Sequence, residues 1–196
     1  MTKNRLLRIT PALGAVAATL ALTGCGGGNS ATPVTTGEDE SVNVQAGHLV
    51  YQVQLSRTLN PHAVDDSQYL QGIDPAELRT GGADELFSVW VRAQNTTSTP
   101  YQSTGDFAMI DAAGNEYDPL PVTGTNPFKY EPQLIEQTSG NGQPTYPDPS
   151  SANGTGPIRG SMLLFRVPVT IYQNEPVELR IVPEEGGEPS TVSLDL

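Results

Sequence analysis

The chain has few of the residues that carry most metal and redox chemistry. Its 196 residues include one cysteine and two histidines, and 22 acidic residues outnumber 10 basic ones. A single cysteine excludes an internal disulfide, so the fold has to be stabilised by a hydrophobic core. The acidic excess argues against electrostatic binding to nucleic acid or to an anionic bilayer. We therefore expect no nucleic-acid partner.

The longest apolar run is too short for a relaxed membrane span. Residues 9–22 (ITPALGAVAATLAL) give 14 apolar or small residues, whereas a spanning helix needs about 20. Three basic residues and no acid precede the run: Lys3, Arg5 and Arg8. A positive segment followed by a short apolar one is the layout of a secretory signal peptide. We predict a signal peptide over residues 1–24, and an uncleaved anchor is the alternative.

The lone cysteine directly follows this segment. Leu22-Thr23-Gly24-Cys25 resembles the bacterial lipobox, in which an aliphatic residue and two small residues precede a cysteine. The resemblance implies that a signal peptidase recognises Leu22, Thr23 and Gly24 and cuts before Cys25. It also implies that the thiol of Cys25 carries a diacylglycerol with fatty acids such as palmitate. Two acyl chains give stable anchoring, so we expect a lipid-anchored protein on the extracytoplasmic face of the cell membrane.

A polar stretch separates the cysteine from the expected domain. Loss of residues 1–24 removes three of the ten basic residues and no acid, which gives a net charge of −15. Residues 26–47 (GGGNSATPVTTGEDESVNVQAG) are rich in Gly, Ser, Thr and acids and have no apolar periodicity. They predict a flexible tether over 25–47 with a taut limit near 70 Å. Residues 48–196 then fit one domain.

Alternating apolar residues mark the first strands. Over residues 49–55, we expect one face to carry four apolar side chains: Leu49, Tyr51, Val53 and Leu55. Residues 85–95 (ELFSVWVRAQN) are apolar on both sides and predict a central strand. Phe87, Val89 and Val91 should face one way, and Leu86 and Trp90 the other.

The rest of the chain also predicts short strands. A hairpin is expected over 106–119, an edge strand over 128–135, and later strands over 160–167, 177–182 and 191–196. Asp65 and Asp74 each begin a short helical turn. About seven short strands without a long amphipathic helix predict an all-β fold, a single antiparallel β-sandwich with one or two helical turns.

Several phrases support a closer comparison. They are FAMIDAAGNEYDP, GSMLLFRVP, VELRIVP and LSRTLNPHAVDDSQYLQG. The first three, in this order, resemble the immunoglobulin-like lipoprotein domains of Gram-positive bacteria, relatives of unknown function of the immunoprotective extracellular protein, and the fourth resembles a recurring segment in predicted lipoproteins of this group. The resemblance covers most of residues 49–196. It implies an immunoglobulin-like sandwich and supplies no catalytic residues.

The residues offer little for catalysis. There is neither a G-x-S-x-G elbow nor an S-x-x-K motif, and both His48 and His62 lie in or beside expected turns. The thiolate that a cupredoxin copper site requires would be the lipidated Cys25, which excludes that site. We therefore predict a protein that is not an enzyme and holds no cofactor.

Two cation sites stay open as alternatives. A copper site could draw on four residues: His48, His62, Met109 and Met162. A calcium site could draw on four others, although no D-x-D-x-D-G loop is present: Asp65, Asp66, Asp74 and Asp148. In both sets core packing, capping and turn formation are the commoner roles.

Recognition is the function that we favour. Tyr101, Tyr130 and Tyr146 lie in expected loops or edges, where an amphipathic ring can face a partner. The loop over 136–157 has no periodicity, and loops of that length are functional or mobile. We predict a non-enzymatic interaction or accessory module of the cell envelope, with an envelope protein or glycan as partner. The alternatives are a lipoprotein that binds a small ligand or glycan and one that binds calcium or copper.

Overall fold

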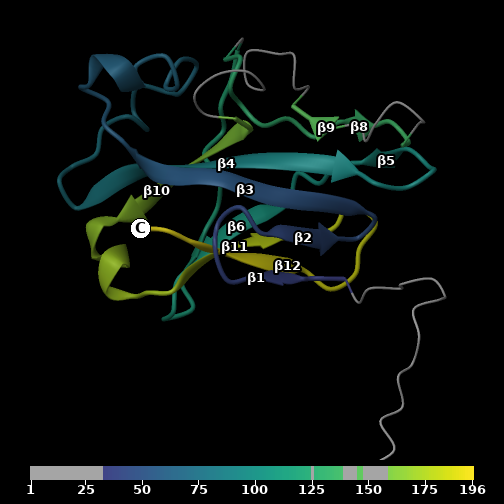
Figure 1. The fold of residues 1–196 in the computed structure, drawn as a ribbon. Helices are drawn as coiled ribbons and strands as arrows, with labels where there is room; N and C mark the ends of the chain where they lie inside the picture. The colour runs from purple at the N-terminus through teal and green to yellow at the C-terminus, as the bar shows by residue number, and fades with distance from the viewer. Residues whose placement is uncertain (1–32, 125, 139–144, 148–158) are drawn as a thin grey trace, which may run out of the picture. The chain divides into compact units, whose positions relative to one another are not determined.

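Two β-sheets packed face to face form the domain (Figure 1). The structure is a computed structural model that describes residues 33–124, 126–138, 145–147 and 159–196. The first sheet has the order β1-β12-β11-β6-β7. The second has the order β10-β4-β3-β2, and β9 also pairs with β4. A separate two-stranded ribbon joins β5 and β8.

The strands are mostly short. In the first sheet they are β1 (Thr36–Gly37), β6 (Phe107–Ile110), β7 (Glu116–Tyr117), β11 (Val177–Ile181) and β12 (Ser190–Leu194). In the second they are β2 (Asn43–Ala46), β3 (Leu49–Leu59), β4 (Asp84–Asn95), β9 (Thr145–Tyr146) and β10 (Ser161–Pro168). The ribbon is made of β5 (Tyr101–Gln102) and β8 (Leu134–Ile135). Two 3-10 turns complete the fold: η1 (Val64–Asp66) and η2 (Val169–Gln173).

The strand order is that of an immunoglobulin domain. The neighbours β3-β4-β10 correspond to strands A, B and E, and β12-β11-β6 correspond to G, F and C. Among the named strands all pairings are antiparallel except β1 with β12. The predicted all-β antiparallel sandwich is confirmed.

The main core lies between the two sheets. The side chains of Phe87, Val89 and Val91 point from β4 into it, and the first sheet contributes Leu179 and Ile181. All five are at most 1 % exposed. The expected strand over 85–95 and its inward face are confirmed, as are the late strands β10, β11 and β12 and the β6–β7 hairpin.

A β-bulge in β3 changes the face of one predicted core residue. Leu49, Tyr51 and Val53 enter the main core as expected. The pairing register then shifts between Val53 and Leu55, so that Leu55 lies opposite Trp90. The extra residue at a bulge reverses the alternation downstream, and Leu55 therefore packs on the outer face of the sheet. The expectation of one continuous face over 49–55 is wrong at this residue.

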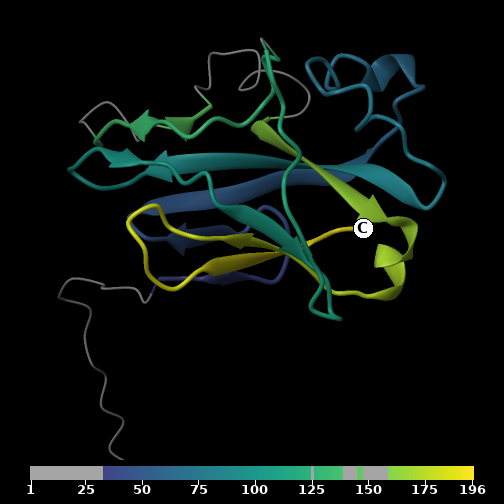
Figure 2. The ribbon, with the colours of Figure 1, turned by 180° about the vertical axis from the view of Figure 1, so that it is seen from behind.

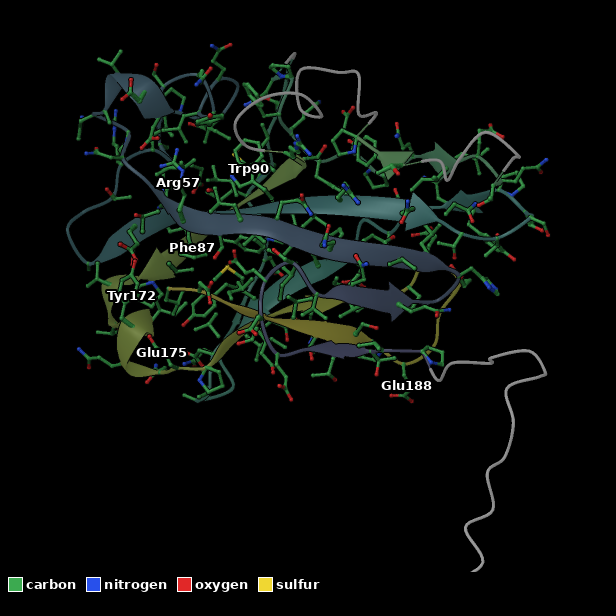
Figure 3. The ribbon with its side chains drawn as sticks, viewed as in Figure 1. Arg57, Phe87, Trp90, Tyr172, Glu175 and Glu188 are labelled. Atoms are coloured by element: carbon green, nitrogen blue, oxygen red, sulfur yellow. The ribbon has the colours of Figure 1, made fainter. Side chains whose placement is uncertain are left out.

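The outer face of the second sheet is buried as well. Leu86 and Trp90 point outward from β4, as predicted, while Met162 and Leu164 do so from β10. Figure 3 labels Phe87 and Trp90 on opposite sides of the sheet. Two long excursions cover this face, residues 60–83 between β3 and β4 and the described residues of 119–130 (119–124 and 126–130) between β7 and β8. The second sheet is therefore the middle layer of this part of the fold.

The two excursions are fastened to the sheet and to each other. Leu120 N–H donates to Leu164 C=O (2.6 Å), and Thr123 N–H donates to Gly72 C=O (3.0 Å). The Nδ2 group of Asn126 donates to Tyr69 C=O (2.9 Å). Figure 2 shows the green stretch that holds residues 119–130 running past β10. Hydrogen bonds to the main chain thus hold both excursions in place, although the excursions contain little regular structure.

The predicted tether includes part of the domain. Residues 32–196 form one compact unit, and within 33–47 the structure places β1 on β12 and β2 on β3. Val44 is fully buried in the main core. One oxygen of Glu40 accepts from Ser56 N–H (3.1 Å), and the other accepts from Asp195 N–H (3.3 Å). The domain boundary at residue 48 and the tether up to residue 47 are therefore corrected, because main-chain pairing orders this polar segment.

The expected edge strand over 128–135 is shorter than predicted. Only Leu134–Ile135 pair, with β5, and Lys129 forms an isolated bridge with Met162. Pro132 interrupts the ladder because it has no N–H to donate. Within the expected long loop, the structure describes residues 136–138 and 145–147 and shows the β9 pairing of Tyr146 with Ala93.

We predict that Val44→Ala lowers the free energy of unfolding by about 2 kcal/mol, because it removes two buried methyl groups. Val34→Ala, at a side chain that is 52 % exposed, is the matched control and should stay within about 0.5 kcal/mol of the parent. Urea unfolding followed by Trp90 fluorescence measures both. Equal stability of the two variants would show that residues 33–47 are not part of the folded core.

Candidate functional site

The predicted lipidation site lies outside the described residues. Leu22, Thr23, Gly24 and Cys25 all precede Pro33, where the described chain begins, so their roles stay predictions. Across the described ranges, no helix has the length and apolar composition that crossing a membrane requires.

The four copper candidates are not brought together. Met109 lies in the core between the sheets. Met162 belongs to β10 and packs on the outer face of the second sheet, with Leu86 and Trp90. His48 lies in the turn between β2 and β3, and His62 is exposed in the turn after β3. Both methionines fill apolar space and are at most 1 % exposed, whereas the His48 side chain is 53 % exposed. The copper alternative gains no support from this arrangement.

The calcium candidates have separate roles. The carboxylate of Asp66 pairs with Arg57, while Asp65 next to it is exposed. One Asp74 oxygen accepts from Ala76 N–H (2.8 Å), which is the capping role that its sequence context suggests. Asp148 lies outside the described residues. Within the part that the structure describes, no three His, Cys, Asp or Glu side chains gather as metal ligands would.

His48 sits on an open turn. Its ring stacks on Tyr101 with centroids 4.2 Å apart, and its Nε2 lies 3.8 Å from Glu185 Oε1. The side chain is 53 % exposed, and its main-chain N–H donates to the same Glu185 oxygen (3.0 Å). The 3.8 Å separation exceeds a hydrogen bond, so the pair lacks the geometry of an acid–base couple.

Two of the three tyrosines predicted to face a partner, Tyr130 and Tyr146, are bonded within the fold. Tyr130 O–H donates to Thr104 C=O (2.9 Å), and Thr104 N–H donates to the hydroxyl of Tyr51 (2.9 Å). The hydroxyl of Tyr146 accepts from Glu131 N–H (3.1 Å), and its ring packs edge-on against Tyr130. Burial raises the pKa of Tyr51 to about 12 and raises that of Tyr130 well above 10. These side chains fasten the β5–β8 region to the sandwich.

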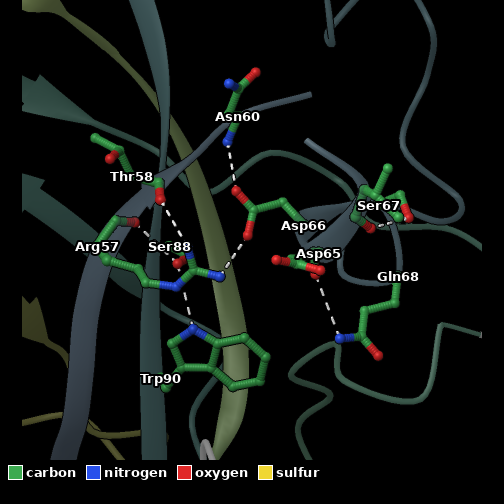
Figure 4. A network of polar contacts seen from close by, with 10 residues as sticks. Arg57, Thr58, Asn60, Asp65, Asp66, Ser67, Gln68, Ser88 and Trp90 are labelled. Carbon is green, nitrogen blue, oxygen red and sulfur yellow. Dashed lines mark hydrogen bonds and ion pairs between the residues drawn. The ribbon is translucent and has the colours of Figure 1, made fainter. Parts of the chain in front are cut away.

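The sequence did not predict the ion pair between Arg57 of β3 and Asp66 of η1. Arg57 NH2 donates to Asp66 Oδ1 at 2.6 Å, and Asn60 N–H donates to Asp66 Oδ2 at 2.8 Å (Figure 4). Burial acts to raise the pKa of Asp66, but the bonds from Arg57 and Asn60 outweigh it and hold the pKa below its usual value. The Asp66 carboxylate thus stays ionised and joins η1 to β3.

The same group reaches the single tryptophan. The guanidinium carbon of Arg57 lies 5.7 Å from the ring centroid of Tyr69, which packs edge-on against Trp90 at 5.0 Å. Trp90 Nε1–H donates to Ser88 Oγ (3.3 Å), and Ser88 O–H donates to Arg57 C=O (3.0 Å). Phe128 completes the aromatic cluster, with its ring 5.8 Å from Trp90. These bonds and ring contacts therefore hold residues 60–83 against the outer face of the second sheet.

Asp111 organises the β6–β7 turn. It accepts bonds from Ala113 N–H, Asn115 N–H and Nδ2, Tyr117 O–H and Asn174 Nδ2. The bond from the Asn115 side chain has the largest effect, and together the donors lower the pKa of Asp111 to about 2. The bond from Asn174 ties this turn to the end of η2. Asp111 is therefore a structural carboxylate.

A cavity of about 190 Å³ lies between β10 and the 119–132 stretch. Its apolar walls include Pro119, Leu120, Pro121, Val122, Tyr130 and Pro132. Small-molecule sites usually measure about 300–1,000 Å³, so this space is too small for a ligand of that class. The Tyr130 hydroxyl is also already bonded to Thr104. This cavity therefore gives no support to the small-ligand alternative.

No protein-family model matches the chain, and no curated protein matches its sequence. Solved structures do resemble it. The Bacillus subtilis protein ycdA, described as a lipoprotein candidate, is 12% identical with a TM-score of 0.46, and the match covers 81% of this chain and 39% of that one. The yjhA protein of Bacillus subtilis is 13% identical with a TM-score of 0.49, over 81% of this chain and 99% of that one.

A third similar structure is an uncharacterized β-sandwich protein from Clostridium difficile 630. It is 10% identical with a TM-score of 0.40, and the match covers 82% of this chain and 96% of that one. The fold of the present chain follows from its own strand order and core.

We predict that Asp66→Ala lowers the free energy of unfolding by about 1–3 kcal/mol, because it removes the acceptor of Arg57 NH2 and of the Asn60 N–H. The neighbouring Asp65→Ala removes an exposed carboxylate and should stay within about 0.5 kcal/mol of the parent. Calcium should leave the melting temperature of all three proteins unchanged. A larger loss for Asp65→Ala than for Asp66→Ala would contradict the assignment.

Proposed function

We propose that this chain is a bacterial lipoprotein whose immunoglobulin-like domain serves as a non-catalytic interaction or accessory module of the cell envelope. The observation that carries the proposal is Leu22-Thr23-Gly24-Cys25 placed directly after a positive and an apolar segment. Cleavage before Cys25 and lipidation of its thiol would hold the mature chain on the extracytoplasmic face of the membrane.

The described side chains support a role without catalysis. Asp66 and Asp111 are committed to structural bonds, and Tyr51 and Tyr130 bind the main chain of Thr104. His48 lies on an open turn, 3.8 Å from the nearest oxygen of Glu185. Immunoglobulin-like sandwiches serve many unrelated functions, and those without catalytic groups commonly bind through end loops or edges.

We also propose kinship with the immunoglobulin-like lipoproteins related to the immunoprotective extracellular protein. The phrase FAMIDAAGNEYDP forms β6, β7 and the Asp111 turn between them. GSMLLFRVP forms β10, and LSRTLNPHAVDDSQYLQG supplies the end of β3 and the first part of the outer cover. Each phrase thus has a defined place in the sandwich.

The lipid anchor is tested by metabolic labelling of the full-length protein with an alkyne-bearing palmitate in a bacterial host. We expect labelling and membrane retention of the parent, and loss of both in Cys25→Ser, which keeps the signal peptide. Asn29→Ser, four residues beyond the lipobox, is the control and should behave as the parent. Unchanged labelling of Cys25→Ser would contradict the proposal.

The interaction role is tested in the same cells by chemical crosslinking followed by identification of the crosslinked neighbours. We expect one envelope protein or glycan to be recovered with the parent and with Asn29→Ser, and to be lost with Cys25→Ser. Recovery of the same neighbour at equal yield from Cys25→Ser would show that anchoring at the membrane is not needed for the interaction.

A further inference from the structure

The N-terminal segment is fastened at one end of the sandwich. Thr36 pairs with Thr191 at the start of β12, and Thr191 N–H donates to Thr35 C=O (2.9 Å). Gln45 N–H donates to Val34 C=O at 2.7 Å. The chain therefore becomes part of the fold at Val34, well before β2 pairs with β3.

This end can be defined by three turns or connections, residues 47–48, 96–106 and 182–189, and we call it the tether end. His48 N–H donates to Glu185 Oε1, and the His48 ring stacks on Tyr101, so the three segments touch. The other end carries residues 60–83, 111–115 and 169–176, and we call it the distal end. Figure 3 labels Glu188 near the first and Tyr172 and Glu175 near the second.

The chain between the proposed anchor and the fold is short. Val34 is nine residues after Cys25, and nine residues span at most about 32 Å when fully extended. This limit holds whatever path those residues take. It is about half of the 70 Å expected for a tether that reaches residue 47. β3 alone, with 11 residues, is about 36 Å long, so the distal end lies roughly one sandwich length beyond the attachment point.

The tether end is acidic. Glu184, Glu185 and Glu188 are exposed in the turn between β11 and β12. Anionic headgroups repel such a surface within a Debye length of about 8 Å. Adsorption to the bilayer therefore cannot hold this end in place, and its distance from the lipid is set by the length of the link.

We propose that the anchored domain stands with its tether end toward the lipid surface and its distal end facing away. This inference rests on the proposed lipidation of Cys25. The pairing of β1 with β12 and the bond from Gln45 N–H to Val34 C=O set the spacing, because they hold the chain from Val34 onward and leave only nine residues for the link to the membrane. Val34 then lies within about 32 Å of the lipid, the turns at 47–48 and 182–189 face the membrane, and residues 60–83 are presented outward.

The orientation is tested by energy transfer on the full-length protein in cell membranes. Acylation blocks Cys25, so an introduced cysteine is the one free thiol for a donor dye. Glu188→Cys and Val64→Cys place the donor at exposed positions on the tether and distal ends, and a lipid-linked dye in the outer leaflet is the acceptor. We expect transfer several-fold higher from position 188. Equal transfer, or higher transfer from position 64, would overturn the orientation.

An insertion variant tests the spacing. About twenty Gly/Ser residues placed between Pro33 and Val34 should reduce the difference between the two positions, because they roughly triple the reach of the link. No reduction would overturn the role of the short link. Fractionation of the same cells separates the two proposals. A membrane-bound protein with equal transfer overturns only the orientation, and a protein that leaves the membrane fraction overturns the lipid anchor as well.

Discussion

The whole fold depends on burying both faces of β4. Its inner side chains, Phe87, Val89 and Val91, are covered by the first sheet, as in any β-sandwich. Its outer side chains, Leu86 and Trp90, would form an exposed apolar surface unless something else covered them. Residues 60–83 and 119–130 supply that cover. The bulge in β3, the Arg57–Asp66 pair and the bonds of Asn126 all help to hold these excursions over the strand.

Several ionisable side chains of the described residues are bonded within the fold. Asp66 and Arg57 fasten the cover, Tyr130 and Tyr51 fasten the β5–β8 region, and Asp111 closes a turn. Each of these groups is satisfied by partners that the fold itself provides. The function that we propose therefore depends on where the domain is held and which end it presents, through the proposed anchor at Cys25 and the pairing of β1.

The sequence predicts the elements whose evidence is local. Apolar residues on both sides of 85–95 indicate a strand buried on two faces, and alternation identifies β11 and β12. The errors involve partners that the local residue pattern does not reveal. β1 and β2 are short and polar, and their order comes from pairing with β12 and β3. Leu55 changes face through a bulge that no residue type marks. Asp66 and Asp65 are indistinguishable until Arg57 is placed beside one of them.

Native-state hydrogen exchange tests most directly whether the outer cover belongs to the cooperative core. The amide of Thr123, bonded to Gly72 C=O, and that of Met162, bonded to Phe128 C=O, report on the cover, and amides of β4 report on global unfolding. We expect the opening free energies of the cover to match those of β4. Fast exchange at Thr123 and Met162 while β4 stays protected would show that the two excursions are ordinary surface loops and that β4 does not depend on them.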